Sequence, residues 1–368
     1  MTKLVLIIGG YGNFGSFIAR MLAPEASVQL IIAGRSLSKA EALLKTLEAA
    51  HNPEAAQLDI SHGLNEALHR IQPDIVIHTS GPFQAQSYHV AEACIGYGCH
   101  YIDLADGREF VCGINALNTH AKEKAVLVCS GASSVPCLTG AIIDKHVGEF
   151  ASLESVEYAI TTAQLTNRGL ATIRAVLSYA GKPFTTLIDG KMQPVYGWLG
   201  LTKRKFWKMN LRLLGNCDVP DLALFPKRYP SIKTLRFRAG LELKILHLSL
   251  TALSQLVRMR LLPSLQPLAK TMLRASYWFD WLGKDRSGFY MTLQGKDPEG
   301  KEKRIQFDLV AKKGDGLCIP AVPAILMAKK LATGEINETG AMPCLGFITL
   351  EEYLDVLTQF NIEWQTNT

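Results

Sequence analysis

Residues 3–15 read KLVLIIGGYGNFG, and this stretch decides the fold. The run from Leu4 to Ile8 is apolar at every position, which is typical of a parallel strand buried on both faces. Glycines follow at the spacing G-x-G-x-x-G, and apolar residues then recur at helical spacing from Phe14 to Leu22. A strand, a glycine turn and a helix in this order predict a dinucleotide-binding motif. An ordinary glycine-rich turn is the alternative, but it does not explain all three glycine positions.

Each glycine of the motif has an expected task. Gly10 permits the tight turn, Gly12 lets the backbone approach a pyrophosphate, and Gly15 lets the helix pack close to the strand. The N–H groups at the start of the helix, together with its positive dipole end, then hold the phosphates.

The residues after the second strand predict which dinucleotide is bound. That strand spans 28–33, and Arg35, Ser36 and Lys39 follow it with no acidic residue before Glu41. Domains that prefer NAD place Asp or Glu here, whereas an arginine suits the 2′-phosphate of NADP. We therefore predict NADP(H). The alternative is that Arg35 is a solvated loop cation. Ser38 and Glu41 predict a capping box for a helix over 40–50.

The alternation of strands and helices continues to residue 129. Further strands are expected at 56–58, 74–78, 100–104 and 125–129, and helices at 64–71, 87–97 and 115–123. This pattern predicts an α/β fold with a doubly wound parallel sheet of the Rossmann type. Ligands bind at the carboxyl ends of the first and fourth strands of such a sheet. We therefore expect Ser80, Gly81 and Pro82 beside the nicotinamide ribose, unless they form a simple turn, and Asp59 near the adenine.

A second domain of the α+β class is predicted from residue 134. Strands expected at 155–161, 234–242, 288–294 and 303–311 belong to a different, mixed sheet, and 171–179 is expected to be helical. The predicted domains are residues 1–133 and 134–339. We expect the C-terminal segment 340–368, with a helix over 351–360, to pack back on the first domain.

Charge is concentrated in one segment. The 368 residues carry a net charge of +6, but residues 201–284 hold sixteen basic and four acidic residues, a net +12. We expect this basic helical segment to meet an anionic partner. Residues 245–282 are amphipathic, basic and rich in aromatic residues, which suits peripheral contact with a membrane interface. A helical lid or a homodimer contact is the other interpretation. Nucleic acid is not expected, because no recognition motif accompanies the charge.

The eight cysteines form no C-x-x-C pair and several lie in apolar runs, so we expect reduced, mostly buried thiols in the cytoplasm. Because a strand is predicted from residue 3, we expect no signal peptide. We also expect no membrane-spanning helix, since no uncharged apolar stretch is long enough. Histidines and cysteines do not cluster at metal-ligand spacing.

Several motifs together resemble the saccharopine dehydrogenase-like oxidoreductases. In chain order they are GGYGNFGSFIARML, GRS, SGPF, HYIDLADGREF, GASSVP and GDGLCIPAVPAILMAKKLATG. The resemblance is dense over residues 1–145 and thin over 150–285. It implies a Rossmann domain that binds NADP(H), a second domain with a mixed sheet, and hydride transfer. The arginines that clamp a dicarboxylate in the lysine-pathway enzyme are not evident, so saccharopine itself is not the expected substrate.

The resemblance also implies roles for residues at matching positions. The pyrophosphate would be lined by Gly10, Tyr11, Gly12, Asn13, Phe14 and Gly15. Arg35 and Ser36 would contact the 2′-phosphate, and Ser80, Gly81 and Pro82 the far ribose. Related members look like enoyl reductases of lipid assembly or proteins of lipid droplets, which suits the basic segment.

Hydride transfer needs a proton donor or acceptor beside the cofactor. Tyr88, Asp103 and Asp106 are the candidates, each with a structural alternative as a packed or capping residue. The sequence predicts an NADP(H)-dependent oxidoreductase for a carbonyl, imine or activated alkene on a small or lipid-like substrate. One alternative is an NADP-binding protein with little turnover that associates with a membrane or a partner; another is an enoyl reductase.

Overall fold

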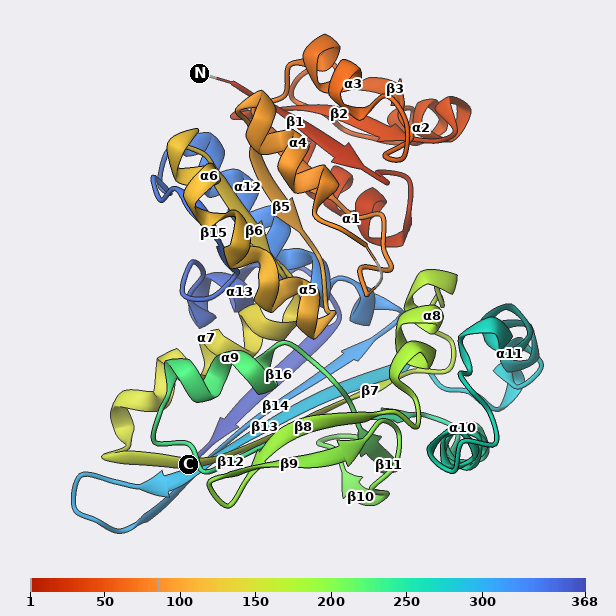
Figure 1. Cartoon of the computed structure of the whole chain (residues 1–368), viewed down its shortest axis with the longest axis vertical. Helices are drawn as coiled ribbons and strands as arrows, with labels where there is room; N and C mark the ends of the chain where they lie inside the picture. Colours follow the sequence, from red (N-terminus) through yellow and green to blue (C-terminus); the bar gives the residue numbers. More distant parts are fainter. Residues whose placement is uncertain (1, 85) are drawn as a thin grey trace. The chain divides into compact units, whose positions relative to one another are not determined.

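The structure is a computed structural model that describes residues 2–84 and 86–368. The chain divides into two compact units, which are coloured by sequence in Figure 1. The first unit comprises Met1–Leu138 and Cys318–Tyr353, and the second comprises Thr139–Leu317 and Leu354–Thr368. The predicted fold class is confirmed, because the first unit contains a parallel sheet and the second a mixed sheet.

The first unit is built on a seven-stranded sheet with the order β15-β6-β5-β4-β1-β2-β3, and every pairing is parallel. Its strands are β1 (Lys3–Ile8), β2 (Val28–Gly34), β3 (Glu54–Gln57), β4 (Ile75–His78), β5 (His100–Asp103), β6 (Leu127–Ser130) and β15 (Gly340–Pro343). The strand order reverses between β1 and β4. A crevice for ligands forms at such a reversal in open parallel sheets.

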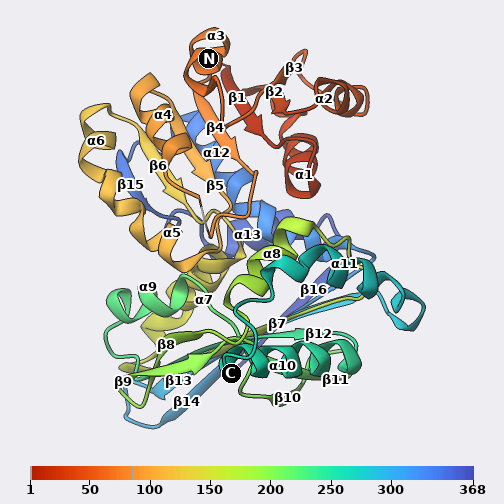
Figure 2. The same ribbon diagram turned by 45° about the vertical axis from the view of Figure 1, so that its right-hand side comes forward.

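Helices cover both faces of this sheet, because the strands are apolar on both sides. The helices of the unit are α1 (Asn13–Leu22), α2 (Leu37–Leu44), α3 (Leu64–Ile71), α4 (His89–Tyr97), α5 (Arg108–Gly113), α6 (Asn118–Glu123) and α12 (Val322–Thr333). Leu6 and Ile8 pack in a core with α3 and α4, and Val5 and Ile7 point to the opposite face. Helix α12 packs on α1, β4 and β5, as Figures 1 and 2 both show.

Helix α2 differs from the prediction at both ends. Ser36, not Ser38, caps its N-terminus, because the Ser36 side chain accepts a hydrogen bond from the Lys39 backbone N–H. The predicted capping box of Ser38 and Glu41 was therefore wrong. The helix ends at Leu44 rather than at residue 50. The predicted helix over 115–123 is in fact divided between a short 3-10 turn, Ile114–Leu117, and α6.

The second unit contains a mixed sheet with the order β10-β11-β12-β7-β13-β14-β16 and a separate hairpin of β8 and β9. Only β12 and β7 pair in parallel in the seven-stranded sheet. The strands are β7 (Ser152–Thr162), β8 (Pro183–Ile188), β9 (Lys191–Tyr196), β10 (Thr202–Lys205), β11 (Leu211–Asn216), β12 (Thr234–Leu241), β13 (Arg286–Lys296), β14 (Glu302–Lys312) and β16 (Ile362–Asn367).

Five helices belong to the second unit: α7 (Thr139–His146), α8 (Leu170–Tyr179), α9 (Asp221–Arg228), α10 (Lys244–Arg258) and α11 (Ala269–Tyr277). Helix α10 packs on β11 and β12, and α11 packs on α8. A buried ion pair joins Arg212 of β11 to Glu242 at 2.9 Å. The second oxygen of Glu242 accepts the backbone N–H groups of Gln164 and Lys284. The carboxylate therefore fastens the ends of three chain segments.

The first half of the basic segment 201–284 consists mainly of strands and only its second half is mainly helical, which corrects the prediction. Residues 202–241 form β10, β11, α9 and β12. Cations in this first half pair with carboxylates, mostly from outside the segment: Lys208 with Glu363, Arg212 with Glu242, Arg228 with Asp144, Lys233 with Glu154, and Arg238 with Glu157. Much of the local excess of charge is thus balanced within the second unit.

The division of the chain differs from the predicted domains in two places. Residues 318–339, predicted to lie in the second domain, belong to the first unit because α12 covers its sheet. Residues 354–368 belong to the second unit, because β16 pairs with β14. The predicted last helix is α13 (Leu350–Leu357), and neither β15 nor β16 was predicted.

One helical stretch in the described residues, Asp315–Thr333, is long and apolar enough to cross a membrane by length and composition, and 56% of its window is buried within the protein. It includes α12 and the charged residues Asp315, Lys329 and Lys330, so it does not contradict the sequence-based statement about uncharged stretches. The eight cysteines form no disulfide within the described residues, and seven of them are buried, as expected.

Two glycine-to-alanine variants test the packing of the first unit. A Cβ on Gly15 of α1 would lie 2.4 Å from the Gly9 carbonyl oxygen and 2.7 Å from the Gly10 Cα, whereas one on Gly96 of α4 would meet no atom within 4 Å. We expect Gly15→Ala to lower the free energy of unfolding by about 1–3 kcal/mol or more. Gly96→Ala should raise it by about 0.5–1 kcal/mol. Urea unfolding measures both, and equal effects would contradict this account of α1.

Candidate functional site

The loop after β1 is compact because its glycines approach other atoms closely. Gly9 has φ +79°, and a Cβ there would lie 2.6 Å from the Ser80 Oγ. The left-handed residue of the turn is therefore Gly9, which the sequence analysis overlooked, and not Gly10. Gly10 is needed for another reason, since a Cβ there would lie 2.8 Å from a methyl group of Ile32. The expected close packing of Gly15 is present.

The N-terminus of α1 is open to a ligand. Gly12 is the N-cap, and no side chain caps the helix. A Cβ on Gly12 would meet only the Gly9 carbonyl oxygen, at 3.1 Å, so the space beside this residue is free of other atoms. Backbone N–H groups at such a terminus, with the positive end of the helix dipole, bind phosphate. The predicted residues Asn13 and Phe14 form the first turn.

The loop after β2 lies beside this terminus through Tyr11. The Tyr11 ring packs against Gly34, where a Cβ would lie 2.5 Å from the ring. The Tyr11 hydroxyl accepts a hydrogen bond from the Ser36 backbone N–H at 3.0 Å. Arg35 and Lys39 are exposed, and neither forms an ion pair with any carboxylate that the structure describes. The two cations thus remain available to an anionic group, whereas the Ser36 hydroxyl accepts the Lys39 N–H and lies 3.1 Å from the Ser38 hydroxyl.

The loop after β4 borders the same crevice. The Thr79 hydroxyl donates to the carbonyl oxygens of Ile8 and Gly9, at 2.9 and 3.1 Å, so it joins the ends of β4 and β1. The Gln86 side chain donates to the carbonyl oxygens of Ser80 and Pro82 at 2.7 and 3.0 Å. These bonds fix the predicted Ser80-Gly81-Pro82 segment. The sequence analysis missed Thr79 and Gln86, although a threonine directly after the fourth strand was a usable signal.

The other residues that the sequence analysis named as site candidates have different surroundings. Asp59 follows β3, and its carboxylate accepts the Ser61 N–H at 3.0 Å, which lowers its pKa. The Tyr88 hydroxyl donates to the Phe110 carbonyl oxygen at 2.8 Å, and partial burial raises the pKa of the phenol. Asp106 lies in the loop after β5, is accessible to solvent and accepts a hydrogen bond from Gln84 at 2.9 Å, and partial desolvation of its carboxyl by the surrounding protein raises its pKa.

Asp103 is fully buried at the end of β5. Its Oδ1 accepts hydrogen bonds from the Ala105 N–H, the Gly131 N–H and the Ser130 hydroxyl, at 2.9, 2.9 and 3.0 Å. Its Oδ2 has no hydrogen-bond partner among the described residues. Burial raises the pKa of Asp103 to about 6, against the opposing effect of the hydrogen bonds. The carboxylate holds the carboxyl ends of β5 and β6 together.

His78 at the end of β4 is also buried, and its Nδ1 lies 3.0 Å from the Tyr101 hydroxyl. The ring packs edge-on against Phe83 of the SGPF segment, with 5.1 Å between ring centroids. Burial lowers the pKa of His78 to about 3, so the imidazole is neutral near pH 7. It is a core histidine that packs against Phe83 and so supports the loop after β4.

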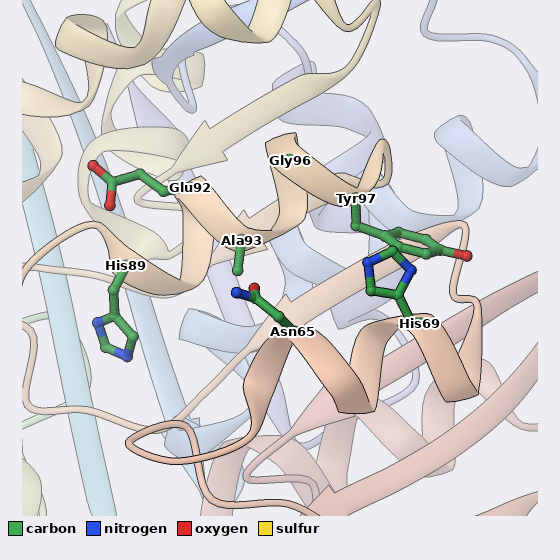
Figure 3. Close-up of a pocket in the computed structure, with 7 residues that line it drawn as sticks. All are labelled: Asn65, His69, His89, Glu92, Ala93, Gly96 and Tyr97. Carbon is green, nitrogen blue, oxygen red and sulfur yellow. The ribbon is translucent and has the colours of Figure 1, made fainter.

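A surface cavity of about 450 Å³ lies between α3 and α4, and Figure 3 shows its lining. Its residues are Asn65, His69, His89, Glu92, Ala93, Gly96 and Tyr97. His89 is held at its edge by the Ile60 carbonyl oxygen at 3.1 Å, and His69 packs edge-on against Tyr97. None of these residues belongs to the loops after β1, β2 or β4. This cavity is therefore distinct from the dinucleotide crevice.

Replacing Asp103 by Asn tests the buried carboxylate. Its pKa is higher in the folded protein than in the unfolded chain, so the folded state binds the extra proton between about pH 4 and 6. As pH rises through this window, the free energy of unfolding of the wild type should therefore fall relative to that of Asp103→Asn. The fall should reach up to about 3 kcal/mol. Above this window the difference should stay constant. Urea unfolding at several pH values measures this difference. Asp59→Asn, at a carboxylate with a lowered pKa, should show the opposite slope. Parallel curves for Asp103→Asn and the wild type would contradict the assignment.

Comparisons with known proteins agree with this geometry. Residues 5–130 match the family model of the saccharopine dehydrogenase NADP binding domain. No curated protein matches the sequence. Among solved structures, the apo histidine-tagged saccharopine dehydrogenase (L-Glu forming) from Saccharomyces cerevisiae has a TM-score of 0.72 at 13% identity, with all of both chains covered. The amine dehydrogenase from Mycobacterium smegmatis has a TM-score of 0.51 at 11% identity, with 94% of this chain and 95% of the other covered.

These similarities confirm the resemblance that the motifs indicated. Over residues 5–130 the chain matches a nucleotide-binding domain family in sequence, and over its whole length it shares the fold of the yeast enzyme. The low identity to that enzyme agrees with the missing dicarboxylate pattern. The chain thus resembles the saccharopine dehydrogenase-like oxidoreductases and has a dinucleotide-binding domain of their type.

Proposed function

We propose that this protein is an NADP(H)-dependent oxidoreductase that transfers a hydride to or from a carbonyl, imine or activated alkene. The observation that carries the proposal is the uncapped N-terminus of α1 at the reversal of strand order, with unpaired cations at the neighbouring end of β2. The first feature suits a diphosphate, and the second suits an additional phosphate on the adenosine ribose.

The choice of NADP over NAD depends on the loop after β2. An NAD-type domain would place a carboxylate here for the ribose 2′-OH. Arg35 and Lys39 instead offer two cations to a phosphate. The Ser36 hydroxyl accepts the Lys39 N–H and lies 3.1 Å from the Ser38 hydroxyl, so it can donate its own proton to a phosphate when Ser38 donates in that contact. Since Tyr11 already binds the Ser36 N–H, we assign the phosphate contacts to the side chains of these three residues.

NADP(H), when bound, supplies or accepts the hydride. The chain's own residues then have to position the far ribose and provide a proton. The Ser80-Gly81-Pro82 segment, which Gln86 and Thr79 hold, suits the first task. Of the three proposed proton-transfer groups, Asp103 is buried and Tyr88 is bonded to a carbonyl oxygen, whereas Asp106 is exposed at the carboxyl end of β5. Asp106 is thus the strongest of these candidates for proton transfer. Asp106→Asn tests this role.

Reversal of the charge at residue 35 tests the cofactor assignment. Arg35→Asp should weaken NADPH binding by about tenfold or more, because a charge-assisted phosphate contact is replaced by repulsion, and should change NADH binding far less. Isothermal titration of both dinucleotides measures the ratio. Lys45→Asp, the same charge change at the other end of α2, is the matched control and should leave the ratio unchanged. An unchanged ratio in Arg35→Asp would refute the role of this residue.

A panel of carbonyl, imine and enoyl substrates, read by nicotinamide absorbance, separates an enzyme from a binding protein with little turnover. Substrate-dependent oxidation of NADPH supports the proposal. Tight NADPH binding without turnover over the whole panel would favour the binding protein. The free thiols suit a reducing compartment, so we propose a cytoplasmic location.

A further inference from the structure

Helix α10 is apolar on the face that points to solvent. Ile245, Leu248, Ala252, Leu256 and Met259 recur at helical spacing and are all exposed, with the four large side chains between 37% and 58% accessible. We call these five residues the outer face of α10. The opposite face, which packs on β11 and β12, contains the buried His247, Leu250, Ser254 and Val257. The exposed side of α10 thus carries a row of large apolar side chains beside Lys244, Ser249, Gln255 and Arg258, whereas the exposed side of an ordinary surface helix is mainly polar.

The chain after α10 exposes further large apolar side chains. Trp278 and Trp281 are 78% and 80% accessible. Polar contacts nevertheless hold the segment that carries them. Arg168 binds the Asp280 carboxylate at 2.6 and 2.8 Å. The Gln164 side chain donates to Asp280 and to the Ser276 carbonyl oxygen. The two indoles therefore point outward from an anchored segment.

Cations accompany these apolar side chains. They are Lys244, Arg258, Arg260, Lys270, Arg274 and Lys284, and all six are exposed. In contrast to the cations of β10 to β12 that pair with carboxylates, none of the six forms an ion pair with a carboxylate in the part of the chain that the structure describes. The single acidic residue of 244–284, Asp280, is bonded to Arg168. This region therefore combines exposed apolar surface with uncompensated positive charge.

We propose that the outer face of α10, together with Trp278 and Trp281, docks this protein on an anionic lipid surface. Apolar side chains and indoles enter the boundary between headgroups and acyl chains, while Lys and Arg side chains bind lipid phosphates. A second copy of the chain is a poorer occupant. A symmetric dimer would bring the same six cations of both copies to one interface, where like charges repel.

Vesicle flotation tests this docking with the full chain. The protein should bind vesicles of phosphatidylcholine and phosphatidylglycerol, bind pure phosphatidylcholine far less, and lose affinity as salt screens the charges. Leu248→Gln/Leu256→Gln should weaken binding at least about tenfold, because it removes apolar insertion. The control Met192→Gln/Leu201→Gln changes side chains of similar exposure elsewhere in the second unit and should have no effect.

Charge is tested in the same way. Lys270→Gln/Arg274→Gln should weaken binding by about fivefold for each charge removed. Lys203→Gln/Lys205→Gln, on β10 of the same basic segment, should have a much smaller effect. All four residues are exposed, so the melting temperatures of these variants should match that of the wild type.

The indoles supply a direct readout. Brominated lipids should quench the tryptophan fluorescence of the wild type, whereas Trp278→Phe/Trp281→Phe should still float with vesicles and lose most of the quenching. Equal binding to neutral vesicles, or equal losses in the target and control pairs, would overturn the proposal. So would absence of lipid binding combined with a dimer that Leu248→Gln/Leu256→Gln dissociates. The Arg35→Asp variant should bind vesicles as the wild type does. The lipid-docking proposal can therefore fail while the cofactor proposal holds, and the reverse is also true.

Discussion

The close approach of backbone to backbone at the start of α1 is the constraint on which the dinucleotide crevice depends. Gly15 lies against the Gly9 carbonyl oxygen, and Gly9 in turn has no room for a side chain beside Ser80. These contacts bring the N-terminus of α1 to the edge where β1 and β4 end. The Thr79 hydroxyl then joins both strand ends by binding the carbonyl oxygens of Ile8 and Gly9. A phosphate site made of backbone N–H groups needs such rigidity, because its donors cannot move independently.

The carboxyl edge of the sheet is held by buried polar groups rather than by apolar packing alone. Asp103 accepts three hydrogen bonds from the ends of β5 and β6, and Glu242 has the corresponding task in the second unit. The two carboxylates differ in how their charge is balanced. Glu242 pairs with the buried Arg212, whereas Asp103 has no cation and its pKa rises to about 6. A buried carboxylate without a counter-ion costs stability when ionised, so its position is maintained by the backbone groups it holds.

The six strands β1 to β6 of the first unit and the residues of the glycine loop could be predicted, because apolar runs and glycine spacing are local signals. Contacts between distant segments could not. Tyr11 binds the Ser36 N–H across the loop, and nothing in the spacing indicated it. β16 was missed because its pairing with β14 joins segments about fifty residues apart. The role of Asp103 was open in the sequence, since burial of a carboxylate at a strand end depends on neighbours from β6.

Two helices show why composition alone does not identify a membrane contact. The stretch that includes α12 is long and apolar enough to span a bilayer, yet eight residues of α12 are buried in the core of the first unit. α10 is shorter and less apolar on average, but the apolar residues of its outer face are exposed, and cations without a carboxylate partner among the described residues accompany them. The hydrophobic effect acts only on surface that water still touches. α12 has already removed most of its apolar surface from water by packing on α1, β4 and β5, whereas the outer face of α10 has not. The outer face of α10 therefore still has apolar surface whose burial can drive association with a membrane, whereas α12 has little such surface left.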